Sequence, residues 1–457
     1  MARTIQRFYH YIIIAVIFLG TGLILGTAHS DPAHAGITPD KVICRVETDR
    51  KVLPSGGPQD VILKVSLEAP PAPVGYDRPR VNLALVLDQS GSMNGKKITH
   101  AKAAAVEAVG RLSGADIFSV VVYDTNIHTI IPARHAENQD WIIDRIQQIR
   151  AEGSTALFGG VSQGAAEIRK NIGNGYVHRI ILLSDGLANV GPRTPGDLGR
   201  LGAALVKENI SVTTVGVGMD YNEDLMAQLA QKSDGNTYFV ESAYDLPAIF
   251  SSELGEVLNV VAKKVNVTIS LPDAVEPMEI IGREGRIVGQ QIQLYMNQLY
   301  GTQEKYALVK VRVPASRAGA TLKVASADVT YENPFTQKQE RSGGVSYASF
   351  TRDLKKAEMS VNMDVVREYQ LNMNAIAQEK AIELSDKGQK EEAVEALKQS
   401  AAKLKTVGAR YKDAVLLKEA RELEIQAESI QDTGMDKKSR KVLRTRSYQM
   451  KNQQVSQ

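Results

Sequence analysis

Residues 80–262 alternate between apolar strand patterns and amphipathic helix patterns, and this alternation constrains the fold more than any other feature of the chain. Residues 81–87 and 179–184 are nearly continuous apolar runs, which is typical of strands buried on both faces of a sheet. Further strand patterns, separated by helix patterns, occur at 117–123, 211–217 and 237–240. The region therefore predicts an α/β unit with a mostly parallel, Rossmann-like sheet covered by helices on both faces.

Strand patterns of a different kind flank this unit. They lie at 42–46 and 61–65 before it, and at 265–271, 306–313 and 321–331 after it. Apolar and polar residues alternate in the later ones, which is typical of antiparallel sheets with one solvated face. Since neither flank has enough strands for a two-sheet core, we predict that residues 36–79 and 263–350 form one β-sandwich around the inserted α/β unit, 80–262.

The C-terminal part has a helical pattern. Residues 351–430 carry the small-and-large apolar spacing of packed helices, and we predict a helical hairpin that gives the chain a means of oligomerising. Basic residues then concentrate at Lys437, Lys438, Arg440, Lys441, Arg444 and Arg446. We predict a basic, disordered tail over 431–457, with attraction to an anionic surface or an acidic partner as the alternative.

The first 35 residues have the order of a secretory signal. Arg3 and Arg7 precede an apolar run over 11–25, and the small residues Ala33 and Ala35 follow it. An uncleaved anchor is the alternative, because the run is about the minimum length for crossing a bilayer. Either interpretation predicts an exported protein that is periplasmic, at the cell surface, or membrane-anchored and facing outward.

Length and composition set wider limits. A chain of 457 residues suggests two to four domains, and 43% hydrophobic with 23% charged residues argues against wholesale disorder. The net charge of +3 is too small to indicate nucleic-acid binding. Cys44 is the only cysteine in the sequence, so no intramolecular disulfide can form, and we expect a buried or idle thiol, with intermolecular pairing as the alternative.

Oxygen-bearing side chains follow the strands of the predicted α/β unit. Asp88, Ser90 and Ser92 come directly after the first apolar run, and Asp185 ends another. Thr155 precedes a helix and can offer a hydroxyl at the same edge of the sheet. Ligands bind at the carboxyl ends of strands in open α/β sheets, and hard divalent cations prefer oxygen ligands. These residues therefore predict a cation site at that edge.

In order and strand context, Asp88, Ser90, Ser92, Thr155 and Asp185 resemble the metal-ion-dependent adhesion site of von Willebrand factor A (VWA) domains, whose pattern is D-x-S-x-S, then T, then D. The resemblance covers roughly residues 80–260. The domain order also resembles that of bacterial exported relatives of the inter-alpha-trypsin inhibitor heavy chains and the calcium-activated chloride channel regulators.

The resemblance implies a mechanism. Ser90, Ser92 and Thr155 would ligate a divalent cation, Mg²⁺ with Mn²⁺ or Ca²⁺ as alternatives, while Asp88 and Asp185 act partly through water. An open coordination position would then accept a Glu or Asp carboxylate from a protein partner. The family also implies that metal geometry can be coupled to movement of the last helix, 246–260. We therefore expect a cation-dependent module for adhesion or envelope assembly.

Other interpretations stay open. The chain could be a scaffold with a structural metal, or the accessory subunit of a metal-dependent enzyme complex. Asp or Ser after a strand also caps helices, which is the alternative for Asp88 or Thr155 taken singly. Asp124 is either a supporting residue at the same edge or a turn residue. The sequence contains no H-E-x-x-H, G-x-S-x-G or phosphate-loop motif, and we expect no catalytic activity.

Overall fold

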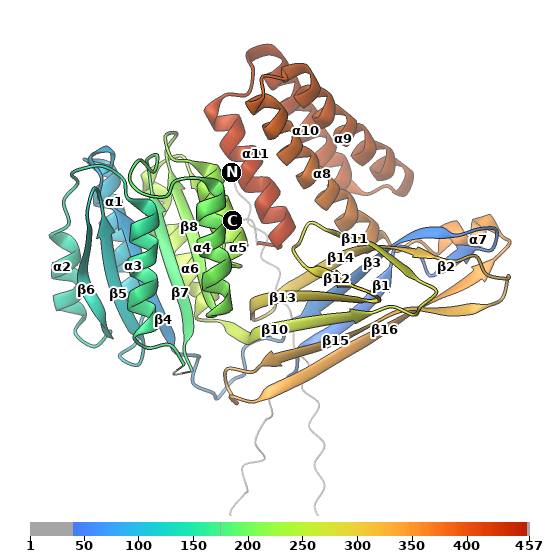
Figure 1. Cartoon of the computed structure of the whole chain (residues 1–457), viewed down its shortest axis with the longest axis horizontal. Helices are drawn as coiled ribbons and strands as arrows, with labels where there is room; N and C mark the ends of the chain where they lie inside the picture. The colour runs from blue at the N-terminus through green and yellow to red at the C-terminus, as the bar shows by residue number, and fades with distance from the viewer. Residues whose placement is uncertain (1–39, 174, 455–457) are drawn as a thin grey trace, which may run out of the picture. The chain divides into compact units, whose positions relative to one another are not determined.

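The computed structural model describes residues 40–173 and 175–454, which form a mixed α/β sheet, two further β-sheets and a group of C-terminal helices (Figure 1). The predicted signal or anchor segment, 1–35, lies outside the described residues. Within them, no helix combines the length and the apolar character needed to cross a bilayer.

The α/β sheet has the strand order β6-β5-β4-β7-β8-β9. All neighbouring pairs are parallel except β5 with β6. The strands are β4 (Val81–Asp88), β5 (Ile117–Tyr123), β6 (Ile127–His135), β7 (Val177–Ser184), β8 (Ile210–Val217) and β9 (Thr237–Val240). Every residue of β4, β5, β7 and β8 is buried, which explains their apolar runs. Strand β6 has no strand pattern in the sequence, because Ile131 is the one buried residue of this edge strand.

Helices cover both faces of this sheet, as the sequence predicts. One face packs on α1 (Lys96–Gly110), α2 (Gln139–Gln147) and α6 (Leu246–Val257). The other packs on α3 (Leu157–Arg169), α4 (Pro195–Lys207) and α5 (Glu223–Lys232). The two apolar clusters lie on opposite faces of β4, whose alternate residues contribute to each.

Strands from both sides of the α/β unit combine in the two sheets of a sandwich. One sheet has the order β1-β3-β14-β11 and the other β12-β13-β10-β15-β16-β2. The strands before the unit are β1 (Ile43–Thr48), β2 (Val52–Pro54) and β3 (Gln59–Glu68). Those after it are β10 (Val260–Ser270), β11 (Glu276–Ile281), β12 (Arg286–Val288), β13 (Gln291–Tyr300), β14 (Glu304–Val313), β15 (Thr321–Glu332) and β16 (Gln339–Thr351).

The sandwich confirms the predicted insertion. Strand β3 pairs with β14 across the inserted unit, and both sheets bury side chains in one apolar core. Cys44 lies in that core, with 7% of its surface exposed, and burial raises the pKa of its thiol to about 11. The free thiol is therefore buried and largely un-ionised at neutral pH.

The C-terminal region contains more helices than the predicted hairpin. They are α7 (Leu354–Met359), α8 (Met363–Asp386), α9 (Lys390–Tyr411), α10 (Ala414–Thr433) and α11 (Lys437–Asn452). Helices α8 to α11 share one apolar core, to which α11 contributes Leu443.

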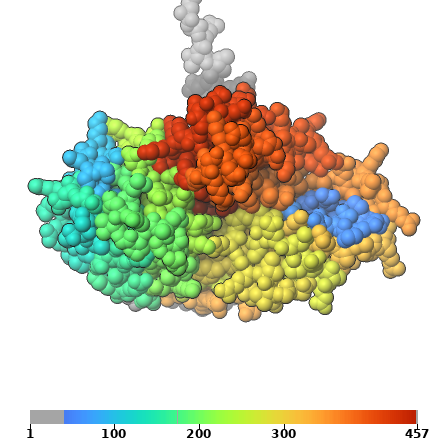
Figure 2. All heavy atoms as spheres, turned by 45° about the horizontal axis from the view of Figure 1, so that its top comes forward, coloured from blue at the N-terminus to red at the C-terminus, as the bar shows by residue number. Residues whose placement is uncertain are grey.

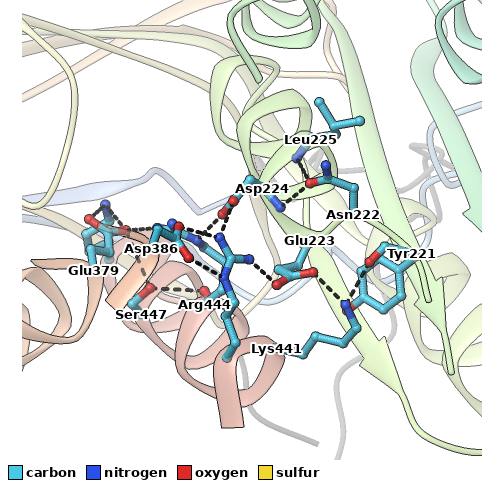
Figure 3. A network of polar contacts seen from close by, with 12 residues as sticks. Tyr221, Asn222, Glu223, Asp224, Leu225, Glu379, Asp386, Lys441, Arg444 and Ser447 are labelled. Carbon is cyan, nitrogen blue, oxygen red and sulfur yellow. Dashed lines mark hydrogen bonds and ion pairs between the residues drawn. The ribbon is translucent and has the colours of Figure 1, made fainter. Parts of the chain in front are cut away.

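The prediction of a disordered tail over 431–457 is wrong for residues 437–452, which form α11. Its basic side chains have acidic partners: Arg440 contacts Asp224, and Figure 3 shows Arg444 beside Asp224 and Lys441 beside Glu223. Figure 2 shows this red segment lying against the green part of the α/β unit. A run of basic residues predicts a solvated tail when the sequence does not reveal the acidic surface that neutralises it.

Candidate cation site

The first part of the candidate site is the loop that follows β4. Asp88 is the last residue of this strand and is fully buried. Its Oδ1 accepts a hydrogen bond from the backbone N–H of Ser90 at 2.9 Å, and its Oδ2 accepts one from the Ser184 hydroxyl at 2.9 Å. The carboxylate therefore fixes the turn of its own loop and ties it to the end of the neighbouring strand β7.

Asp185 follows β7 directly and meets the same loop. Because β4 and β7 are parallel neighbours, their carboxyl ends lie side by side. The Ser92 hydroxyl donates to Asp185 Oδ1 at 2.7 Å, and the Ser90 and Ser92 Oγ atoms are 3.1 Å apart. Asp185 is fully buried and Ser92 is exposed, so the cluster runs from the interior to the surface.

Thr155 reaches this edge from the loop before α3. The N–H of Gly91 donates to the carbonyl of Gly153 at 3.0 Å, which joins that loop to the one after β4. A side chain at Gly186 would place its Cβ 3.3 Å from Ser92 Oγ and 3.4 Å from Thr155 Oγ1. Glycine at 186 therefore leaves space between the two hydroxyls, and the structure brings all of the candidate residues to one edge of the sheet.

Supporting residues, most of them outside the sequence prediction, hold these loops. Gln89 Nε2 donates to Asp124 Oδ2 at 2.6 Å, and the N–H of Ala156 donates to the carbonyl of Asp124 at 2.8 Å. Asn189 Oδ1 accepts from the N–H of Thr155 at 2.8 Å. Asp124 thus has the supporting position considered from topology. Gln89 and Asn189 gave no sequence signal beyond their closeness to Asp88 and Asp185.

The electrostatics of the edge are dominated by carboxylates. Burial, together with the nearby charge of Asp185, raises the pKa of Asp88 to about 6. The ammonium of Lys97, from α1, is 2.5 Å from Asp185 Oδ2 and is partly exposed. Two buried carboxylates are therefore balanced by one partly exposed side-chain cation, which is an arrangement that a bound cation would stabilise.

The donor set fits a hard cation held mainly by hydroxyls. Among residues 40–173 and 175–454, no group of three or more His, Cys, Asp and Glu side chains is arranged to hold a metal ion. A cation at this edge would therefore use Ser90, Ser92 and Thr155 beside two carboxylates, all of them oxygen donors of the kind that Mg²⁺, Mn²⁺ and Ca²⁺ accept.

Comparison with known proteins agrees with the α/β fold described above. Residues 82–252 match the family model of the von Willebrand factor type A domain. The chain is 25% identical to the uncharacterized protein sll0103 of Synechocystis over 318 residues, which are 67% of this chain and 71% of that protein. It is 28% identical to human inter-alpha-trypsin inhibitor heavy chain H4 over 173 residues, 36% of this chain and 18% of that one.

The chain is also 27% identical to the uncharacterized protein YfbK of Escherichia coli, over 50% of this chain and 40% of that protein. The chain therefore spans less than half of YfbK and less than a fifth of the heavy chain. Among solved structures, a von Willebrand factor type A protein from Catenulispora acidiphila has a TM-score of 0.66 at 16% identity, covering 82% of this chain and 89% of that one. The ArnB paralog VWA2 from Sulfolobus acidocaldarius has a TM-score of 0.58 at 17% identity, covering 90% and 98%. At these identities the likeness shows the fold alone.

Proposed function

Because residues 82–252 belong to the von Willebrand factor type A domain family, a family of protein-interaction modules that often depend on a metal, we propose that this chain is an exported binding module that captures a partner's carboxylate through a divalent cation. The observation that carries the proposal is the contact between the Ser92 hydroxyl and Asp185 Oδ1, at 2.7 Å, beside the paired Ser90 hydroxyl. It joins two segments that lie far apart in the sequence into one group of oxygens.

The cation would be held by the hydroxyls of Ser90, Ser92 and Thr155, with Asp88 and Asp185 balancing its charge. Mg²⁺ is the expected ion, with Mn²⁺ and Ca²⁺ as alternatives. Neutral hydroxyl ligands leave much of the positive charge of an ion uncompensated, which favours an additional anionic ligand. Since Ser92 is exposed, that ligand can come from outside the chain, as a Glu or Asp side chain of a protein partner.

Movement of α6 is not part of the proposal. Glu253 on α6 is fully buried and lies 3.2 Å from the equally buried Arg179 of β7. The carboxylate also accepts from Tyr238 at 3.1 Å. Breaking a buried ion pair of this kind costs about 3–5 kcal/mol, so we expect α6 to keep its position when the site is filled.

Export is proposed on the N-terminal sequence alone, through a cleaved signal or an anchor within residues 1–35. We expect the protein in the periplasm, at the cell surface or on the outward face of a membrane. N-terminal sequencing of the protein recovered from cell fractions tests this. A full-length protein in the cytoplasmic fraction would contradict it.

Calorimetric titration with Mg²⁺, Mn²⁺ and Ca²⁺ tests the cation site directly. Wild-type protein should bind one ion, and Asp88→Ala should bind it at least about 100-fold more weakly, because the variant loses both a carboxylate and the anchor of the loop. The matched control is Asp140→Ala, in an exposed first turn of α2, which should bind like wild type. Equal binding by Asp88→Ala and wild type would remove the site.

A pull-down then tests use of the site. Partner capture from an envelope extract should require Mg²⁺ or Mn²⁺, be lost with chelator, and be competed by free acetate or glutamate. If the protein binds a metal ion in calorimetry but still captures its partner in the presence of chelator, a scaffold with a structural ion would be favoured. No enzymatic step is proposed, and activity screening of the metal-loaded protein checks this.

A further inference from the structure

A cavity of about 480 Å³ lies at the opposite edge of the α/β sheet from the cation site. It is lined by the last turns of α4 and α5, the turn 282–286, strand β13 and the end of α11. Lys207 is the last residue of α4 and precedes the first residue of β8, so it lies where strands of the parallel sheet begin. The cavity is therefore separate from the residues that carry the proposed function.

Basic side chains outnumber acidic ones in its lining. Lys207, Lys232, Arg283, Arg286 and Lys451 face it, against Asp234 and Glu284. Several of these charges are already balanced: Lys232 pairs with Glu284, Arg283 lies 3.6 Å from Asp234, and Lys451 pairs with Glu379 of α8 at 2.7 Å.

Lys207 and Arg286 are different, because neither side chain has a hydrogen-bond or ion-pair partner in the part of the chain that the structure describes. A lysine in the last turn of a helix also stabilises the helix dipole, which accounts for Lys207. It does not account for Arg286, which lies on the exposed strand β12.

Arg283 supplies an independent observation. Its side chain is 8% exposed, and its Nε is buried without a hydrogen-bond partner. A buried guanidinium with an unmet donor is costly, so such groups mark places where a ligand can complete the hydrogen bonding. Its NH2 group donates to Gln453 Oε1 at 2.9 Å, beside the C-terminal end of α11.

The turn that carries Arg283 and Arg286 packs closely against its neighbours. A Cβ at Gly285 would lie 2.8 Å from Ile280 Cδ1 and 2.9 Å from the carbonyl of Gln293. A Cβ at Gly282, where φ is +73°, would clash with Asn372 of α8. Glycine therefore lets this turn pack closely against β13 and α8, and the packed turn places the backbone of Arg283 and Arg286 beside the cavity.

We propose that this cavity binds a small organic dianion, a phosphate monoester or a dicarboxylate. The two unpaired cations match two negative charges, and guanidinium groups bind phosphate and carboxylate oxygens in the same forked geometry. Val206, Leu294 and Tyr295 in the lining favour a ligand with a carbon skeleton over an inorganic ion. The volume is within the range of small-molecule sites, roughly 300–1,000 Å³.

Calorimetry with glycerol 2-phosphate and with succinate, against glycerol as the neutral probe, tests the proposal on the full chain. Wild-type protein should bind at least one dianion with a Kd below about 1 mM, and glycerol should not bind. The variant carrying both Lys207→Ala and Arg286→Ala should lose at least about 10-fold in affinity. Binding of glycerol 2-phosphate alone would identify a phosphate monoester as the ligand class, and binding of succinate alone would identify a dicarboxylate.

Two controls make the test specific. Lys338→Ala with Arg317→Ala removes the same charges from exposed positions outside the cavity and should bind like wild type. Asp88→Ala should also bind the dianion unchanged, which separates this site from the cation site. Absence of binding by wild type to both dianions up to about 10 mM, or equal binding by the cavity variant and its control, would overturn the proposal.

Discussion

Two groups of acidic side chains on the α/β unit differ in how their charge is balanced. At the cation edge, Asp88 and Asp185 are both buried, and within the described residues their one ion pair is with Lys97. On α5 and the loop before it, Asp220, Glu223 and Asp224 face four basic residues of α11. Those residues are Lys437, Arg440, Lys441 and Arg444.

The difference separates carboxylates that stabilise the fold from carboxylates that are available to a ligand. Every carboxylate of the α5 group has an ion-pair partner on α11, and these pairs hold α11 against α5 (Figure 3). The edge group has hydroxyls beside it and too little positive charge. Burial raises the pKa of Asp88 to about 6, whereas Arg444 and Arg440 hold the pKa of Asp224 below its usual range, against the effect of burial.

The largest expected effect comes from breaking the α5 group. Lys441 is 2% exposed, and its Nζ lies 2.5 Å from Glu223 and 2.7 Å from the carbonyl of Tyr221. Lys441→Ala should lower the free energy of unfolding by about 2–3 kcal/mol, because the buried Glu223 would keep only Arg440 as a partner and the carbonyl of Tyr221 would lose its charged donor. Chemical denaturation measures this.

The control for that prediction is Lys437→Ala, whose ion pair with Asp220 is exposed and should matter by less than about 1 kcal/mol. Neither variant should change the affinity for Mg²⁺. A large loss of Mg²⁺ affinity in folded Lys441→Ala would show that the two acidic groups are not independent, and the comparison would fail.

A pH titration sharpens the comparison further. In the metal-free protein the pKa of Asp88 is about 6, above the value near 4 of an unfolded carboxyl, so the folded state binds the proton more tightly. This contribution to stability is absent above pH 6 and grows as the pH falls from 6 toward 4. Between pH 7 and pH 5 it should amount to about 1 kcal/mol relative to Asp88→Asn, measured by denaturation at each pH.

The contribution of Asp224, in the α5 group, should change with pH in the opposite direction. Because its folded pKa is lowered, Asp224 stabilises the protein above the unfolded value and loses that contribution only as the pH falls through the folded value. Asp224→Asn should therefore leave the pH 7 to pH 5 difference unchanged. If Asp88→Asn also leaves it unchanged, the buried edge carboxylate does not titrate as described.

The sequence predicted the edge well and the α5 group poorly, for a physical reason. Strand ends of a parallel sheet meet at one edge by topology, so Asp88 and Asp185 could be placed together from their strands alone. The contact between α5 and α11 joins residues more than 200 positions apart and follows no periodic rule. The sequence alone therefore predicts a solvated tail where the structure has α11.

The sandwich shows the same distinction. The strands before and after the α/β unit were too few on each side to fold alone, and that count predicted one shared sandwich, in which the structure pairs β3 with β14. Strand β6 could not be predicted, because an edge strand with one buried residue has no alternation to detect. Lys97 was missed because a lysine in the first turn of a helix carries no indication of the carboxylate that it meets.

The smallest expected effect concerns that lysine. The ammonium of Lys97 lies 2.5 Å from Asp185 Oδ2 and partly neutralises this carboxylate. Lys97→Met keeps the length of the side chain and removes the charge, so a divalent cation no longer competes with it for Asp185. Affinity for Mg²⁺ should rise by about 3- to 10-fold, or about 1 kcal/mol, since the lysine is partly exposed and its attraction is screened by water. Calorimetry beside Lys437→Met, which removes an equal charge from the α5 group, measures the difference. Weaker binding by Lys97→Met would mean that this lysine orders the edge for the cation instead of competing with it.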